Sequence, residues 1–153
     1  MRVATTNALR ALALLLLGAC DEPAHRHGLA LVDAPPGGPV EPIITDELAR
    51  AITAHDALLV YVGASWCEPC REFHDAAAAG TLDDSLGALR LLVFDADRDG
   101  DALEAAGYHS NLIPLFAVPR IDGRASGKQT EGAIKGRPAA LQLVPRLDRL
   151  LGR

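Results

Sequence analysis

The sequence predicts an α/β domain in which a mixed central β-sheet carries helices on both of its faces. Short apolar runs typical of buried strands alternate with helical segments, and a hairpin signal and a final helix follow them. The 153 residues include 27 Ala and 24 Leu, a composition that favours helices over an all-β fold. The net charge of −5 argues against a nucleic-acid-binding surface, so no nucleic acid partner is expected.

The folded domain is expected to cover residues 43–153, and its first elements lead into a cysteine pair. Thr45 is suited to cap a helix that buries one apolar face. Residues 58–62 (LLVYV) form an apolar run rich in strand formers, which predicts a buried strand. A second helix is expected from the cysteine pair to Gly80.

The second half of the domain is expected to complete the sheet. The predicted elements are a buried strand at residues 90–95, a short helix at 101–106, a strand at 115–118 and a strand that ends near Gly132. Asp122-Gly123 is a hairpin turn signal between the last two strands. Pro138 can begin a last helix, and Pro145 inside that helical pattern predicts a kink or a split.

The N-terminal residues have the pattern of a processing segment. Arg2 and Arg10 flank a polar stretch, and the apolar run at 11–17 is too short to span a membrane. Residues 17–20 (LGAC) resemble the lipobox of bacterial lipoproteins. We therefore expect a lipoprotein signal peptide at 1–19 and a lipidated Cys20 that anchors the chain to a membrane. The alternative is an ordinary secretory signal followed by a chance cysteine.

A Pro/Gly-rich tether is expected at residues 20–42, beginning with the lipidated cysteine. Five of the ten prolines fall in this stretch, and no hydrophobic period survives there. His25 and His27 could hold a metal ion loosely, but solvated linker residues are the simpler interpretation.

Chemistry is expected at Trp66-Cys67-Glu68-Pro69-Cys70, where the first buried strand turns into a helix. Unpaired N–H groups and the helix dipole stabilise an anion at a helix N-terminus, so this position favours the thiolate form of Cys67. Cys70 lies one turn further along and can attack a mixed disulfide that Cys67 has formed. Pro69 suits an early helical position because its missing N–H is not needed there.

This motif resembles the active site of the thioredoxin family, which has the pattern Trp-Cys-x-x-Cys and the same proline before the second cysteine. Ile113-Pro114 stands where that family has a cis-proline that faces the active site and binds the backbone of the partner peptide. Asp122-Gly123 and Gly132 fit the late hairpin of the family. The resemblance covers about residues 43–153 and implies a thioredoxin-like fold.

The resemblance also implies the roles of the site residues. Cys67 and Cys70 would be catalytic, and the residues that bind the partner would be Trp66, Ile113 and Pro114. No cofactor is expected, because the two cysteines carry the electrons themselves.

Three positions depart from the pattern of the family. Tyr61 occupies the place of the buried acid that aids proton transfer from the second cysteine, and a phenol titrates too high to replace a carboxylate near neutral pH. Val93 stands where the neighbouring strand has a lysine. Glu68 replaces a glycine, and its negative charge is expected to raise the Cys67 pKa and to make the pair more reducing. Water or Glu68 is then left to move the proton.

Other interpretations of the cysteine pair stay open. Cys67 and Cys70 could form a purely structural disulfide, or they could bind zinc or copper together with His74, although a fourth ligand is missing. Haem attachment is excluded because Arg71, and not a histidine, follows the second cysteine. Residues 95–100 imitate a calcium loop, but Ala106 stands where that loop needs a glutamate, so no metal is assigned.

The sequence as a whole predicts a lipid-anchored thiol–disulfide oxidoreductase of the cell envelope that faces the periplasm. Its expected partners are thiol- or disulfide-containing envelope proteins and a membrane thiol donor that re-reduces the pair, with reduction of partner disulfides as the favoured direction. Asp21 resembles the signal that retains lipoproteins in the inner membrane of enteric bacteria. The alternative is a non-catalytic thioredoxin-fold adaptor or a copper- or zinc-binding module, which would not need a reactive Cys67.

Overall fold

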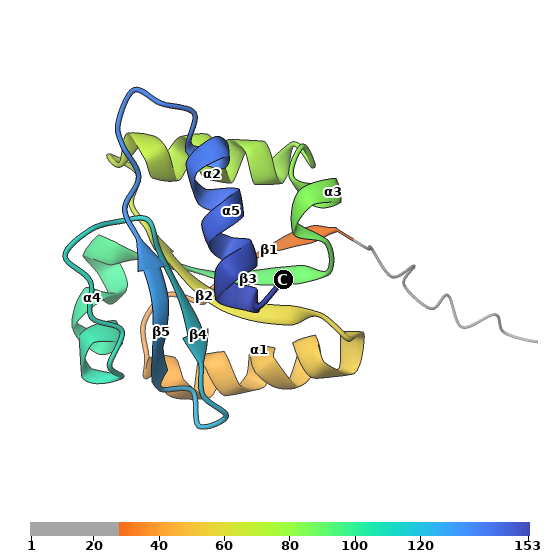
Figure 1. Cartoon of the computed structure of the whole chain (residues 1–153). Helices are drawn as coiled ribbons and strands as arrows, with labels where there is room; N and C mark the ends of the chain where they lie inside the picture. The colour runs from red at the N-terminus through yellow and green to blue at the C-terminus, as the bar shows by residue number, and fades with distance from the viewer. Residues whose placement is uncertain (1–27) are drawn as a thin grey trace, which may run out of the picture.

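A computed structural model describes residues 28–153, which form a five-stranded sheet with helices on both sides (Figure 1). The strands are β1 (Leu29–Asp33), β2 (Ala57–Gly63), β3 (Leu89–Asp95), β4 (Leu115–Pro119) and β5 (Ala125–Glu131). The helices are α1 (Val40–Ala54), α2 (Glu68–Ala78), α3 (Asp83–Leu86), α4 (Ala96–Ala105) and α5 (Ala139–Leu151). None of these helices is long and apolar enough to cross a membrane.

The strand order is β1-β3-β2-β4-β5, and the sheet is mixed. β1, β3 and β2 run parallel, with Leu91 of β3 opposite both Leu31 and Leu59. β4 runs antiparallel to β2, and β5 turns back antiparallel to β4 after Asp122-Gly123. The predicted mixed sheet is confirmed, and β2, from which the cysteine pair follows, lies at its centre.

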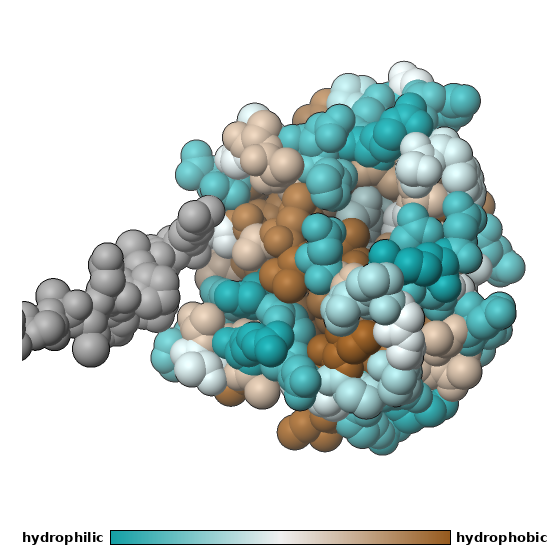
Figure 2. Space-filling view, turned by 180° about the vertical axis from the view of Figure 1, so that it is seen from behind, coloured by the Kyte–Doolittle hydropathy of each residue, from teal (hydrophilic) through white to brown (hydrophobic). Residues whose placement is uncertain are grey.

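Alternate side chains of the central strand point to opposite faces of the sheet, as the period of a strand requires. Leu58, Val60 and Val62 pack with residues of α1 and α4. Leu59 and Tyr61 pack on the other face with residues of α2, α3 and α5. Helices on both faces are thereby confirmed, and the architecture is the thioredoxin-like fold that the sequence resemblance implied (Figure 1). From behind, hydrophilic residues surround hollows in which apolar residues show (Figure 2).

The beginning of the domain differs from the prediction. Sequence analysis places a tether at residues 20–42, but Leu29–Asp33 form β1, which pairs along its whole length with β3. The tether is therefore wrong for these residues, because their backbone is bound in the sheet. The predicted signal peptide at 1–19, Cys20, Asp21, His25 and His27 lie outside the described residues.

Two helices begin earlier than predicted, and a third is not split as predicted. α1 begins at Val40 rather than at Thr45, since Pro42 lies in the first turn, where its missing N–H is not needed. α4 begins at Ala96 rather than at residue 101, because the Asp95 side chain accepts the N–H groups of the first turn. α5 continues through Pro145, so the predicted split is wrong.

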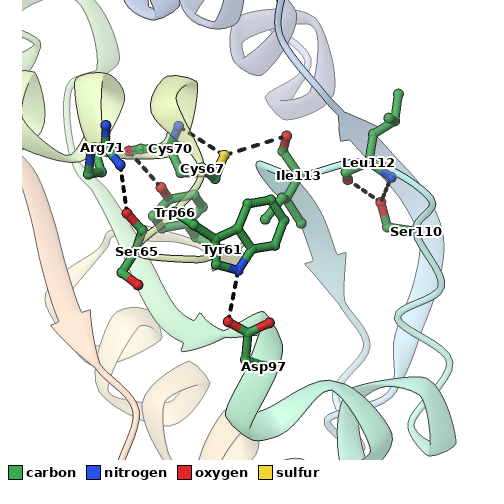
Figure 3. Close-up of a disulfide and its surroundings, with 10 residues drawn as sticks. All are labelled: Tyr61, Ser65, Trp66, Cys67, Cys70, Arg71, Asp97, Ser110, Leu112 and Ile113. Carbon is green, nitrogen blue, oxygen red and sulfur yellow. Dashed lines mark hydrogen bonds between the residues drawn. A yellow bond between two sulfur atoms is a disulfide. The ribbon is translucent and has the colours of Figure 1, made fainter. Parts of the chain in front are cut away.

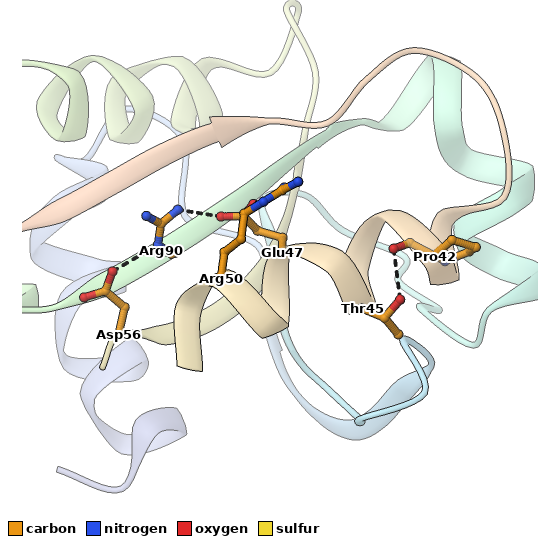
Figure 4. Close-up of polar contacts among 6 residues, drawn as sticks. All are labelled: Pro42, Thr45, Glu47, Arg50, Asp56 and Arg90. Carbon is orange, nitrogen blue, oxygen red and sulfur yellow. Dashed lines mark hydrogen bonds and ion pairs between the residues drawn. The ribbon is translucent and has the colours of Figure 1, made fainter. Parts of the chain in front are cut away.

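A charged cluster ties α1 to the sheet (Figure 4). Arg90 of β3 donates from Nη1 to Oε1 of Glu47 at 2.5 Å and from Nε to Oδ2 of Asp56 at 3.0 Å. Glu47 is only 2% exposed. A buried carboxylate is costly unless it is paired, so these contacts fix α1 in its place over β3.

Candidate active site

The cysteine pair lies where the central strand β2 ends and helix α2 begins. Cys67 is the N-cap of α2, with extended backbone angles, and its Sγ accepts the N–H of Cys70 at 3.3 Å. Pro69 occupies the first turn of α2, as predicted. An anion at this place is stabilised by the N–H of Cys70 and by the positive end of the helix, so the geometry favours a Cys67 thiolate in the reduced pair.

The two cysteines are joined by a disulfide with an Sγ–Sγ distance of 2.01 Å. Cys67 is 5% exposed and Cys70 is 2% exposed. Ala64 is buried with them, and Ala96 and Ile113 pack against the cluster. Of the two residues Cys67 is slightly the more exposed, and its sulfur lies beside the loop that holds Ile113.

The loop before β4 faces the disulfide, as the resemblance implied. The Ile113-Pro114 bond is cis. The carbonyl oxygen of Ile113 lies 3.8 Å from Sγ of Cys67 (Figure 3). The carbonyl oxygen of Pro114 accepts the N–H of Gly132 at 2.8 Å. The predicted cis-proline is therefore confirmed, and it brings the carbonyl oxygen of residue 113 beside Sγ of Cys67.

Trp66 lies at the rim of the site and is 65% exposed. Its Nε1 donates to Oδ2 of Asp97 at 2.8 Å, which ties the indole to the first turn of α4 (Figure 3). The sequence interpretation of residues 95–100 did not include this partner. An acidic residue in the first turn after a buried strand was the signal that could have suggested it.

Glu68 is turned toward the loop between β5 and α5. Its carboxylate accepts the N–H of Gly136 at 3.2 Å and lies 3.4 Å from Nζ of Lys135. Glu68 was expected to raise the Cys67 pKa, and this expectation took no account of Lys135. The lysine offsets part of the negative charge, and the carboxylate is already engaged by the loop, which argues against Glu68 as the group that moves the proton.

Tyr61 lies under the pair, on the α2 face of β2, and is 2% exposed. Its hydroxyl donates to the carbonyl oxygen of Cys70 at 3.1 Å, and its ring stacks on Phe116 with centroids 4.8 Å apart. Burial raises the Tyr61 pKa far above its ordinary value, so the phenol stays protonated at any physiological pH. The hydroxyl is thus a fixed donor to Cys70 and no substitute for a carboxylate.

A cleft of about 500 Å³ opens on the Cys70 side of the pair. It lies between the ends of β1, β2 and β3 and the starts of α2 and α4, and both Tyr61 and Cys70 line it. The strand register places Asp33, Val93 and Tyr61 in one row across the sheet. The cleft therefore connects the buried cysteine with charged side chains at the surface, a feature that the sequence alone did not suggest.

Cys67, Cys70 and His74, which were considered for metal binding, do not form part of a ligand set in the described part of the chain. Within residues 28–153, no three His, Cys, Asp or Glu side chains are grouped so that they could hold a metal ion. Residues 95–100 belong to the start of α4, where Asp95 caps the helix, and do not form a loop around a cation. The zinc or copper interpretation of Cys67, Cys70 and His74 gains no support from this geometry.

Two comparisons find no match, and a third finds solved thioredoxins. No family model and no curated protein matches the chain. The chain is similar to thioredoxin O1 from Arabidopsis thaliana in its oxidized state, with 18% sequence identity, a TM-score of 0.48 and coverage of 80% of this chain and 96% of that chain. It is also similar to a thioredoxin from Trichomonas vaginalis, with 22% identity, a TM-score of 0.46 and coverage of 76% and 96%. At such identities, the role of each residue has to follow from the geometry of this chain itself.

Proposed function

We propose that this chain, with its thioredoxin-like fold, is a thiol–disulfide oxidoreductase that is anchored in the cell envelope and reduces the disulfides of envelope proteins. The observation that carries the redox function is the position of Cys67. Its sulfur accepts a helix N-terminal N–H at 3.3 Å and forms a disulfide with Cys70 one turn along. This arrangement stabilises a thiolate at the rim and keeps a second sulfur ready to resolve the product.

The reaction consists of two exchanges. The Cys67 thiolate attacks one sulfur of a partner disulfide, the partner S–S bond breaks, and the first partner thiolate leaves. Cys70 then attacks Sγ of Cys67 in the mixed disulfide, which releases the second partner thiolate and forms the Cys67–Cys70 bond. The partner gains two electrons, and the cysteine pair loses two. A membrane thiol donor would return the pair to its reduced form.

The partner would bind along the cis-proline loop. The carbonyl oxygen of Ile113 lies beside Sγ of Cys67, where it can accept an N–H from an extended partner segment. The exposed indole of Trp66 offers apolar area next to the cysteine pair, and its bond to Asp97 holds it in place. Pro114 fixes the loop through its carbonyl bond to Gly132.

The direction and the location rest on sequence features. The negative charge of Glu68 next to Cys67 disfavours the thiolate, and a less stable reduced form makes a pair more reducing. The lipobox-like ending at Cys20 supports an envelope location and a lipid anchor, and the partners are then envelope proteins. Lys135 weakens the effect of Glu68 without removing it, because an exposed ion pair is screened by water.

The function is tested by trapping the intermediate. Cys70→Ser leaves the attacking sulfur without its resolving partner, so it should accumulate a mixed disulfide with a disulfide-containing test protein. Cys67→Ser is the matched control and should form none, because it lacks the sulfur whose thiolate the helix N-terminus stabilises. If Cys67 in the wild-type protein fails to reduce the test disulfide in the presence of a small thiol, the adaptor interpretation replaces this one.

A further inference from the structure

The second exchange has an unmet chemical requirement, because Cys70 must lose its proton before it attacks. An ordinary thiol has a pKa of about 8.5, so most of it is protonated near neutral pH. Cys70 is 2% exposed, and the Tyr61 hydroxyl next to it already donates to the Cys70 carbonyl. Within residues 28–153, the groups that can receive the proton are those reached through the cleft that Cys70 lines.

His74 lines the same cleft and lies one helical turn beyond Cys70. Residues four apart on a helix have Cβ atoms about 5–6 Å from each other, so one or two waters can join the two side chains. The His74 side chain is 42% exposed, and its Nδ1 lies 3.9 Å from Oδ1 of Asp75. The imidazole therefore stands at the mouth of the cleft, in contact with both the interior and the solvent.

Gly63 keeps the inner end of the cleft open. A Cβ at this position would lie 3.0 Å from the Tyr61 hydroxyl and 3.4 Å from Cβ of Cys70. The glycine thus leaves free the space that separates the hydroxyl from the Cys70 side chain. Water that enters the cleft can approach Cys70 there.

His74 is the acceptor best matched to a thiol among the groups that share the cleft. The charged and titratable side chains that face it are Arg71 and Asp75 of α2, Asp33 at the end of β1, Asp95 at the end of β3, Arg98 of α4 and Tyr61 of β2. The Asp95 carboxylate already caps α4 by accepting two N–H groups. A carboxylate is too weak a base to take a proton from a thiol efficiently. An imidazole is closer to a thiolate in basicity, and proton transfer is most effective between matched groups.

We infer that His74 accepts the proton of Cys70 through water in the cleft when Cys70 attacks the mixed disulfide, an inference that rests on the proposed function. The S–H bond of Cys70 breaks, its electron pair forms the new S–S bond with Cys67, and the partner sulfur leaves with the electrons of the old bond. The proton passes by way of water to the imidazole and from there to solvent or to the leaving thiolate. Nothing is oxidised or reduced beyond the exchange itself.

The test follows the two exchanges separately with dithiodipyridine, a disulfide whose leaving group absorbs light. When the reduced full-length protein is mixed with one equivalent in a stopped-flow instrument, attack by Cys67 releases the first leaving group in a bimolecular phase. Attack by Cys70 releases the second in a phase that is independent of concentration. Cys70→Ser should lack that second phase. His74→Gln is compared with wild type across the pH range, and His109→Gln, an exposed histidine outside the cleft, is the matched control.

The expected result is a second phase that His74→Gln slows about tenfold or more near pH 7, with the first phase unchanged. The difference should vanish above about pH 9, where solvent hydroxide deprotonates the thiol. Imidazole added to His74→Ala should restore the rate, and His109→Gln should match wild type. A second phase equal in His74→Gln and wild type at every pH would overturn the inference, as would slowing that persists unchanged at high pH. A wild-type protein without any second phase would instead refute the proposed function.

Discussion

Substitution of Tyr61 separates the contribution of its hydroxyl from that of its ring. The hydroxyl donates to the Cys70 carbonyl at 3.1 Å in a site that is 2% exposed. The ring stacks on Phe116 with centroids 4.8 Å apart and meets the edge of Phe73 at 6.0 Å. Tyr61→Phe removes the first interaction alone, and Tyr61→Leu removes all three.

The two variants have different expected costs. One hydrogen bond contributes about 0.5–1.5 kcal/mol net, so Tyr61→Phe should lower the free energy of unfolding by about 1 kcal/mol. Each aromatic pair adds about 0.5–1.5 kcal/mol beyond burial, so Tyr61→Leu should lower it by about 2–4 kcal/mol in total. The bimolecular attack by Cys67 should stay unchanged in Tyr61→Phe, because the hydroxyl contacts Cys70 and not Cys67.

Urea denaturation of the oxidised protein measures both changes, provided that the dependence on urea keeps its wild-type slope. Burial holds the phenol in its protonated form, so the result should not depend on pH between about 6 and 9. If Tyr61→Phe is as unstable as Tyr61→Leu, the ring contacts contribute nothing to the free energy of unfolding and the prediction is wrong. If Tyr61→Phe is as stable as wild type, the hydrogen bond of the hydroxyl contributes nothing and the prediction is equally wrong.

Three further predictions concern the surroundings of the pair. Glu68→Gln should speed the attack by Cys67 about twofold near neutral pH, because it removes a screened negative charge worth about 0.5 kcal/mol. Stopped-flow kinetics measure this rate, and an unchanged rate would contradict the prediction. Asp97→Ala frees the Trp66 indole, so it should slow the reduction of protein disulfides severalfold and leave the reduction of small disulfides unchanged. An equal effect on both kinds of substrate would contradict this prediction. Burial alone would raise the Asp99 pKa, but the Arg98 hydrogen bond, the Asp95 N–H and the Arg98 charge lower it overall. The stabilisation by the Asp99 carboxylate is therefore present above about pH 4 and is lost as the pH falls. Asp99→Asn should lower the free energy of unfolding by about 1–2 kcal/mol near neutral pH and by much less under acid conditions. Urea denaturation near neutral pH and under acid conditions would show the difference.

Much of the fold follows from local sequence signals. The runs at 58–62 and 90–95 are apolar on both faces, as strands buried between two helical layers must be, and both are strands of the sheet. The turn at Asp122-Gly123 also stands where the local sequence placed it, and the cis-proline at Pro114 stands where the family resemblance implied it. Each of these features depends on particular residues that are close to one another in the sequence.

The errors concern residues whose structure depends on distant partners. β1 has only five residues and lies within a Pro/Gly-rich stretch, and it is a strand because β3 offers it a free edge. No period in residues 29–33 reveals that edge. The cleft could not be predicted for the same reason, because Asp33, His74 and Arg98 come from three separate elements that only the fold brings together.

At the site, the sequence suggested the cysteine pair and the proline that faces it, but not the residues that hold Trp66 and Glu68 in place. Cys67, Cys70 and Pro114 belong to recognisable motifs, and the structure brings them together. Asp97 as the partner of Trp66 and Lys135 as the partner of Glu68 are far apart in sequence from the residues they contact. To predict such contacts, one must know the register of the sheet and the course of the loops.

The reduction potential of the Cys67–Cys70 pair tests the central claim most directly. The purified protein is equilibrated against thiol buffers of graded potential, and the fraction of the disulfide is measured by thiol labelling. The account predicts a midpoint near about −270 mV or below, which suits a reductant fed by a membrane thiol donor. A midpoint near about −120 mV would contradict the reducing direction and indicate an oxidant of client proteins. If the pair forms no disulfide at any potential, the redox function itself is wrong.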